Sequence, residues 1–150
     1  MVSLIVILAA LPAQDAKLEQ FLVGTWRLNP NTVTFVPSAV GRAYEATRKK
    51  GVIAEQFRKE AAKNTDVKYT FLKDHSYAVN HKDYRINAKG RITTKGTWKL
   101  RGNDVVVTMS NKPPFPAVFR ISRDMKELQL HQVAGDNGTL TIGMLRVRNG

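Results

Sequence analysis

Apolar and polar positions alternate with a period of two over most of the second half of the chain, beginning at Val67. This period is typical of strands that bury one face and expose the other. It is clearest over residues 91–100. There one face carries Ile92, Thr94, Gly96, Trp98 and Leu100, and the other carries Arg91, Thr93, Lys95, Thr97 and Lys99. We therefore expect the first set to point inward and the cations to point outward.

Turn-forming residues interrupt the alternation at short intervals, at positions 74–75, 101–104, 124–126 and 135–138. Many short strands with regular turns are the pattern of an all-β barrel or sandwich. Strands that follow one another through tight turns pair antiparallel, and closing the meander removes its exposed edges. The sequence thus predicts an all-β fold, an antiparallel up-and-down barrel of about eight strands.

The first strand of this barrel is expected at residues 24–28, where Gly24-Thr25-Trp26-Arg27-Leu28 is followed by the turn residues Asn29-Pro30-Asn31. Residues 32–36 are expected to form a further strand or an extended connection. Together with the later strands, they complete the predicted meander.

Two segments have a helical period instead. Residues 15–23 place apolar side chains three and four positions apart, on one helix face. Residues 38–64 are rich in Ala, Glu, Lys and Arg, and their apolar residues recur at helical spacing: Ile53, Phe57 and Ala61. Ser38 is a candidate N-cap, and Gly51 divides the segment at a position that suits the end of its first helix. We expect two short helices inserted after the first strand.

The chain begins with an apolar run, VSLIVILAAL at positions 2–11, followed by Pro12-Ala13-Gln14. A bilayer span takes about 20 apolar residues, so this shorter run matches the core of a secretory signal peptide instead. We expect residues 1–13 to be a signal peptide and residues 14–150 to form one secreted or periplasmic domain. Because no Lys or Arg precedes the run, two alternatives stay open: a start upstream, or an apolar N-terminal element packed on the core.

Composition excludes several classes of chemistry. The chain has no cysteine, which excludes disulfides, thiolate nucleophiles, iron–sulfur clusters and Cys-ligated zinc. Its 24 Lys and Arg residues outnumber 12 Asp and Glu residues and give a net charge of +12, which attracts polyanions. With no apolar run long enough to span a bilayer, the chain is not expected to be an integral membrane protein.

Gly24 and Trp26 form a Gly-x-Trp motif on the first predicted strand, and Arg146 and Arg148 lie on the last. This combination resembles the small bacterial exported lipocalin-like (calycin-type) domains, a family largely of unknown function. The resemblance implies that Trp26 plugs one end of the barrel beneath a basic residue, a cation–π contact of about 0.5–2 kcal/mol. A second motif, Gly96-Thr97-Trp98-Lys99-Leu100, repeats Gly24-Thr25-Trp26-Arg27-Leu28 with one change. The helices expected at 38–64 depart from a plain lipocalin.

No catalytic, metal or cofactor site is expected. The three histidines, His75, His81 and His131, have no second ligand at helical spacing, and no serine lies in a Gly-x-Ser-x-Gly motif. The candidates for a ligand cavity are inward aromatics: Tyr69, Phe71, Tyr77, Trp98 and Phe119. The candidates for a basic surface are Lys82, Arg85, Lys89, Arg91, Lys95, Lys99 and Arg101. That surface lacks interleaved aromatics for base stacking, so no specific nucleic-acid binding is expected.

Three interpretations of function stay open. The leading one is a non-enzymatic exported protein that takes a small apolar or amphipathic ligand at the open end of a lipocalin-like barrel. Rim cations such as Arg85 or Lys89 would then meet an acidic head group of the ligand. The alternative is a basic module that binds polyanions or an anionic component of the cell envelope. The third is an enzyme of unrecognised type.

Overall fold

The computed structural model describes residues 13–110, 117–133 and 135–148. Its strands are β1 (Gly24–Pro37), β2 (Lys68–Phe71), β3 (Ser76–Lys82), β4 (Arg91–Arg101), β5 (Asp104–Met109), β6 (Ala117–Ile121), β7 (Leu128–Val133) and β8 (Gly138–Arg146). Its helices are α1 (Ala13–Leu22), α2 (Ala39–Ala46), α3 (Val52–Lys63) and the short 3-10 helix η1 (Gly135–Asn137). The predicted signal peptide lies outside the described residues, apart from Ala13 at the start of α1.

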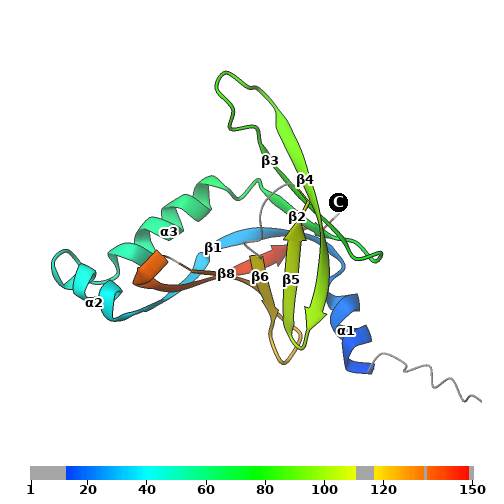
Figure 1. The fold of residues 1–150 in the computed structure, drawn as a ribbon, viewed down its shortest axis with the longest axis horizontal. Coiled ribbons are helices and arrows are strands. Elements are labelled where there is room, and N and C mark those ends of the chain that lie inside the picture. Colours follow the sequence, from blue (N-terminus) through cyan, green and yellow to red (C-terminus); the bar gives the residue numbers. More distant parts are fainter. Residues whose placement is uncertain (1–12, 111–116, 134, 149–150) are drawn as a thin grey trace, which may run out of the picture.

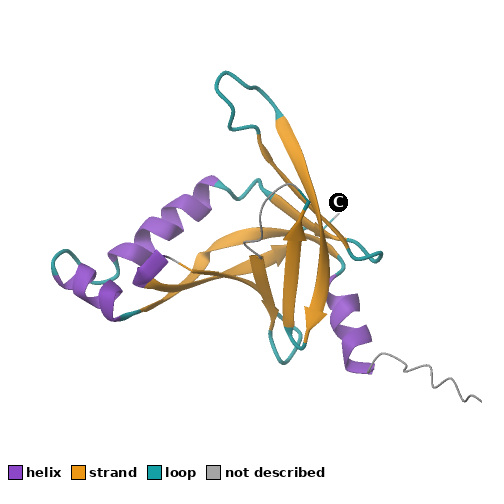
Figure 2. Ribbon diagram, viewed as in Figure 1, coloured by secondary structure: helices purple, strands orange, loops and turns teal. Residues whose placement is uncertain are grey.

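The eight strands form one closed barrel in which each pairs antiparallel with the next (Figure 2). Closure comes from β1 and β8, whose register places Trp26 opposite Arg146 and Phe35 opposite Leu140. Because the first and last strands pair, each of the eight strands has a neighbour on both sides, although β1 pairs with β2 only over residues 24–26. The predicted all-β, up-and-down antiparallel barrel is therefore confirmed.

The predicted break after the first strand is wrong. β1 runs without interruption from Gly24 to Pro37, through the Asn29-Pro30-Asn31 segment that was expected to be a turn. Its pairing with β8 shifts register between Leu28 and Val33, which is a bulge. A bulge tolerates Pro30, which has no N–H to donate to the ladder. The hydroxyl of Thr32 secures it by donating to the Asn29 carbonyl (2.8 Å) and accepting from the Gly143 N–H (3.0 Å).

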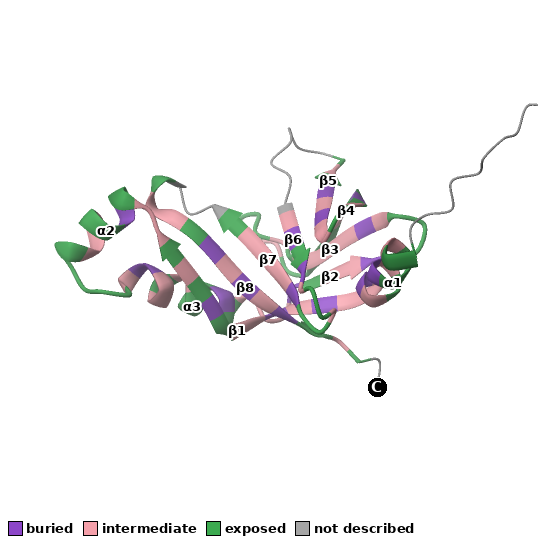
Figure 3. Cartoon of the chain, turned by 90° about the horizontal axis from the view of Figure 1, so that it is seen from below, coloured by how far each residue is buried: buried purple, intermediate pink, exposed green. Residues whose placement is uncertain are grey.

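The predicted helical insertion is confirmed as α2 and α3, between β1 and β2. Ser38 is the N-cap of α2, where its hydroxyl accepts from the Gly41 N–H at 3.1 Å. Gly51 has a left-handed φ of 81° and directly precedes α3, so it begins the second helix rather than ending the first. α3 lies alongside β1 and buries Ile53 and Ala61 (Figure 1). α2 is mostly exposed (Figure 3).

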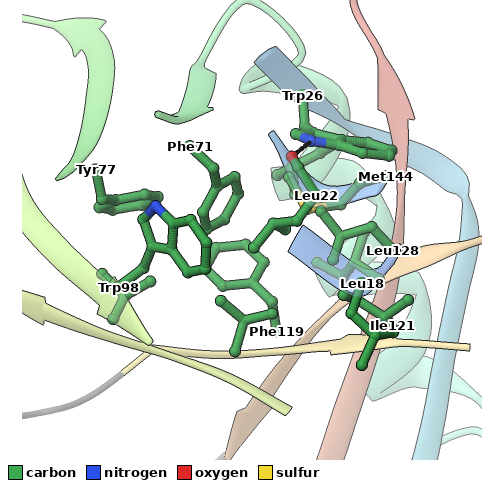
Figure 4. Close-up of a cluster of buried hydrophobic side chains, with 14 of the residues drawn as sticks. Leu18, Leu22, Trp26, Phe71, Tyr77, Trp98, Phe119, Ile121, Leu128 and Met144 are labelled. Atoms are coloured by element: carbon green, nitrogen blue, oxygen red, sulfur yellow. Dashed lines mark hydrogen bonds between the residues drawn. The ribbon is translucent and has the colours of Figure 1, made fainter. Parts of the chain in front are cut away.

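The two ends of the barrel differ. At the end where β1 begins and β8 finishes, α1 covers the opening with Leu18 and Leu22, which are fully buried (Figures 1 and 4). We call this end the floor. The opposite end, which we call the mouth, carries α3 and the β3–β4 hairpin. The core is continuous from α1 into the barrel, so the floor is packed solid.

Candidate functional site

The floor is organised around Trp26, which is 3% exposed. Its indole N–H donates to the Leu22 carbonyl at 2.9 Å and so joins β1 to the last turn of α1 (Figure 4). The guanidinium of Arg146 lies over the ring, 4.3 Å from its centroid. Arg146 also donates to the carbonyls of Phe21 and of Val23 (2.9 Å to Val23), and burial lowers its pKa. Strand β8 is thereby tied to the helix that closes the floor.

Gly24 and Arg148 are the other two residues of the predicted floor motif, and only Gly24 has a role in the floor. Gly24 has a φ of 144°, and a Cβ there would overlap the guanidinium of Arg146. Glycine at this position therefore leaves the space that the arginine fills. Arg148 lies beyond the end of β8 and is exposed, whereas Arg146 makes the contact with Trp26.

The second motif supports the floor at another point. The indole N–H of Trp98 donates to the Leu72 carbonyl at 3.0 Å. The ring of His75 packs against the indole with centroids 4.3 Å apart, and His75 Nε2 lies 3.0 Å from the carboxylate of Glu19 on α1. Each tryptophan of the repeated motif thus bonds to a leucine carbonyl and lies beneath a side chain that is also linked to α1.

Above this floor the barrel is hollow. A cavity of about 1050 Å³ opens at the mouth, where Glu60, Tyr84 and Gln132 line it and are exposed. Its apolar lining is Leu28, Phe57, Ala61, Val67, Val79, Met109, Val118, Phe119, Leu130 and Ile142. Cavities that take small ligands commonly measure about 300–1,000 Å³ and are lined in this way by apolar side chains with a few polar ones.

The predicted cavity aromatics separate by depth. Tyr69, Tyr77 and Phe119 line the cavity. Phe71 and Trp98 lie among the packed core residues instead, with their ring centroids 6.3 Å apart (Figure 4). Burial raises the pKa of both Tyr69 and Tyr77. Both phenols are protonated at neutral pH, as an ordinary tyrosine also is, and can donate hydrogen bonds into the cavity.

A polar cluster crosses the mouth, and sequence reasoning missed it. His81 Nε2 lies 3.3 Å from the hydroxyl of Thr94, and the His81 ring stacks on Tyr84 with centroids 5.6 Å apart. The Tyr84 hydroxyl donates to the side-chain carbonyl of Asn64 at 3.1 Å. This mouth cluster (Asn64, His81, Tyr84 and Thr94) joins the β3–β4 hairpin to the residue that follows α3.

α3 supplies a wall of the cavity through Phe57 and Ala61, which sequence analysis placed on one helix face without assigning them to a site. Their four-residue spacing was the available signal, because an apolar helix stripe must cover some other apolar surface. The strand residues Val79, Met109 and Leu130 were likewise detectable only as members of alternating strands.

Charge is sparse in the lining. Glu60 is the one Asp, Glu, Lys or Arg among the lining residues in the described part of the chain, and it pairs with Lys63 at 2.9 Å. His131 also lines the cavity, and burial lowers its pKa. Arg85 and Lys89, the expected rim cations, lie on the exposed hairpin and do not line the cavity. Among the described residues, the cavity lining therefore contains no lysine or arginine that could pair with an acidic head group of a ligand.

The basic-surface candidates fall into two groups. Three of them pair with carboxylates: Arg91 lies 2.7 Å and Lys82 3.9 Å from Asp66, and Arg85 contacts Asp83. The others are exposed, with no carboxylate within 4 Å among the described residues: Lys89, Lys95, Lys99 and Arg101. Lys95 and Lys99 do face outward from β4, as the alternation predicted.

No helix in the described part of the chain is long and apolar enough to cross a membrane. Among the same residues, no group of three or more His, Asp or Glu side chains could hold a metal ion.

Comparison with known proteins places the chain in a family without assigning an activity. A search against functionally curated proteins gave no match. Among solved structures, the chain is similar to a DUF4847 family protein from Bacteroides vulgatus ATCC 8482, with 18% sequence identity and a TM-score of 0.45. That alignment covers 88% of this chain and 98% of the other. The model of a family described as a domain of unknown function, DUF5004, matches residues 10–150, so the chain belongs to the DUF5004 family.

Proposed function

We propose that this protein is a non-enzymatic binding protein, and that it holds a small amphipathic ligand in the barrel cavity. The observation that carries the proposal is the hollow between a packed floor and a mouth braced by α3. A cavity of about 1050 Å³ inside a closed barrel, lined mostly by apolar side chains, favours burial of an apolar molecule. We place this activity outside the cytoplasm, because residues 2–11 fit a signal peptide.

The lining indicates the chemistry of the ligand. Its apolar part includes the buried side chains of Phe119 and Ile142 and the partly buried Leu130, which suit an apolar body. Near the mouth the lining offers hydrogen-bonding groups, notably His81, Tyr84 and Asn64, and no lysine or arginine that the structure describes belongs to the lining. A ligand with an apolar body and an uncharged polar end therefore fits this cavity better than a free fatty acid.

Two neighbouring threonines on β4 provide a matched test. Thr94 lines the cavity, whereas Thr93 is exposed on the outer face, and each bonds one side chain of β3. Thr94→Trp should narrow the cavity where β4 lines it and weaken binding of the uncharged fluorescent probe N-phenylnaphthylamine at least tenfold. Thr93→Trp should leave the affinity unchanged. Equal affinities in the wild type and Thr94→Trp would contradict binding of the probe against this wall of the cavity.

Native mass spectrometry of gently purified protein tests the same proposal without a chosen probe. A releasable extra mass of lipid size that Thr94→Trp abolishes would support the proposal.

The dependence of binding on ionic strength separates cavity binding from the polyanion alternative. Binding inside an apolar cavity should be nearly indifferent to salt, whereas polyanion binding weakens steeply as salt rises. If the affinity for small ligands fell steeply as salt rose, binding to the basic surface would be favoured instead.

A further inference from the structure

The β3–β4 hairpin carries the most exposed large hydrophobic side chain among the described residues. Ile86 is 93% exposed and Tyr84 is 69% exposed, and both lie in the connection between the two strands. The hairpin extends away from the rest of the barrel (Figure 1). An exposed isoleucine at the end of a projecting loop loses hydrophobic stabilisation unless it meets an apolar partner.

Backbone hydrogen bonds and an ion pair fix the conformation of the hairpin tip and keep Ile86 exposed. The Asp83 N–H donates to the Gly90 carbonyl, and the Ala88 N–H donates to the Arg85 carbonyl, both at 3.0 Å. The Asp83 carboxylate accepts from the backbone N–H of Arg85 at 3.1 Å and also pairs with its guanidinium. The left-handed φ of Asn87, 62°, turns the chain immediately after Ile86.

Cations flank this apolar tip. Positions 82–91 hold four cations against the single carboxylate of Asp83: Lys82, Arg85, Lys89 and Arg91. Arg91 is held at the base of the hairpin by Asp66 and Asn80, so Lys82, Arg85 and Lys89 are the cations available at the tip. The side chain of Arg85 is 79% exposed and that of Lys82 is 63% exposed, so their charges reach solvent although each lies near a carboxylate. The net charge of +12 adds a long-range attraction of the same sign.

We propose that the tip of the β3–β4 hairpin docks on an anionic lipid bilayer, with Ile86 inserted among the lipid headgroups and Lys82, Arg85 and Lys89 placed on the anionic surface. An exposed apolar side chain with cations on the same loop matches the bilayer interface, which offers an apolar phase directly beneath negative charge. A dissolved polyanion offers no such phase to Ile86. A single projecting loop is also small for a stable protein–protein interface, which buries about 800 Å² on each partner.

Docking of this kind brings the cavity mouth to the membrane, because Tyr84 belongs both to the hairpin and to the cavity lining. Only that consequence, transfer of a ligand between bilayer and cavity, rests on the proposed function. The evidence for the docking surface comes from the hairpin alone, so an experiment can contradict one of the two proposals without contradicting the other.

Vesicle flotation tests the docking surface. The full chain should float with vesicles of phosphatidylcholine and phosphatidylglycerol and not with vesicles of phosphatidylcholine alone. Ile86→Asp should lower the affinity at least tenfold. The matched control Leu72→Asp changes a 47% exposed residue beside the floor and should leave flotation unchanged. Lys89→Ala should lower the affinity about fivefold, whereas Lys126→Ala, in the β6–β7 turn, should have little effect.

A second measurement reports insertion directly. The tryptophan introduced by Ile86→Trp should be quenched by brominated lipids, while Trp26 and Trp98 are buried and should not be. Absence of flotation with anionic vesicles would overturn the proposal, as would equal losses in Ile86→Asp and Leu72→Asp. Binding to heparin or DNA without binding to vesicles would assign the basic surface to a dissolved polyanion. Thr94→Trp should retain flotation, and Ile86→Asp should retain probe binding in solution, which separates this proposal from cavity binding.

Discussion

The guanidinium carbon of Arg146 lies 4.3 Å from the centroid of the Trp26 ring, directly across the β1–β8 seam. The same arginine holds two carbonyls at the end of α1. One side chain therefore joins the first strand, the last strand and the helix that closes the floor.

Loss of this arginine should weaken the whole fold. Arg146→Met should lower the free energy of unfolding by about 1–3 kcal/mol, because it removes the cation–π contact and the charge-assisted bonds to the carbonyls of Phe21 and Val23. Urea unfolding measures the change. Arg148→Met is the control, since Arg148 is exposed and should contribute little. Equal effects of the two substitutions would contradict the role given to Arg146.

Removal of the indole should be more severe. Trp26→Ala should destabilise the protein by about 3–5 kcal/mol, because the ring is 3% exposed and its loss leaves a cavity in the floor. A double-mutant cycle with Arg146→Met should show coupling, since the two residues are in contact. Unchanged stability of Trp26→Ala would refute the floor assignment.

Gly24 should tolerate no side chain. Gly24→Ala adds a Cβ at a φ of 144° and in the space of the Arg146 guanidinium, so we expect a loss of about 1–3 kcal/mol. Gly51→Ala, at a φ of 81° with nothing within 4 Å of an added Cβ, is the control and should cost less. Thermal unfolding of both variants at one pH compares them.

The hairpin carries an acid-sensitive group. The guanidinium of Arg85, through its hydrogen bonds, lowers the pKa of Asp83 to about 2. A carboxyl whose folded pKa is depressed contributes stability above its unfolded pKa of about 3.9, and loses it as pH falls toward 2. Carboxyl NMR titration should show Asp83 ionised down to about pH 2. Arg85→Ala should return its pKa toward the ordinary range, whereas Arg101→Ala should not move it.

The mouth cluster should control how fast a ligand enters and leaves the cavity. Tyr84→Phe removes the hydroxyl that donates to Asn64 while keeping the ring that stacks on His81. Because the bond is exposed, global stability should change little, but the hairpin should separate more often from α3. Stopped-flow displacement of N-phenylnaphthylamine should then show faster release, and Tyr44→Phe on the exposed α2 should show the wild-type rate.

The barrel was predictable because its signals are local. The alternation at 91–100 identified which face of β4 is outward, and Thr94 and Trp98 do point inward. Ile92, expected on the same inward face, is 38% exposed, because β4 extends there beyond its pairing with β5. The segment Asn29-Pro30-Asn31 misled the prediction of β1 because the same residues suit a turn and a bulge. Which of the two forms depends on pairing with β8, more than 100 positions along the chain.

The candidate site was predictable only in part. Alternation places Tyr69 and Phe71 on one face, but it does not say how deep each lies along the barrel axis. The rings of Trp98 and Phe119 pack against Phe71, so the cavity begins at Tyr69 and Tyr77. The hydrogen bond between Tyr84 and Asn64 depends on how α3 packs against β1. No local sequence pattern determines that packing arrangement.

The β1–β8 seam has a consequence for how the molecule is made. Arg146 and the Val23 carbonyl that it binds are 123 positions apart, so the floor cannot be completed until β8 has left the ribosome. Contacts between distant parts of a chain slow folding and leave strand edges unpaired in the meantime. A chain that lacks β8 should therefore remain an open sheet that needs protection, and the barrel should close only once β8 is available to pair with β1.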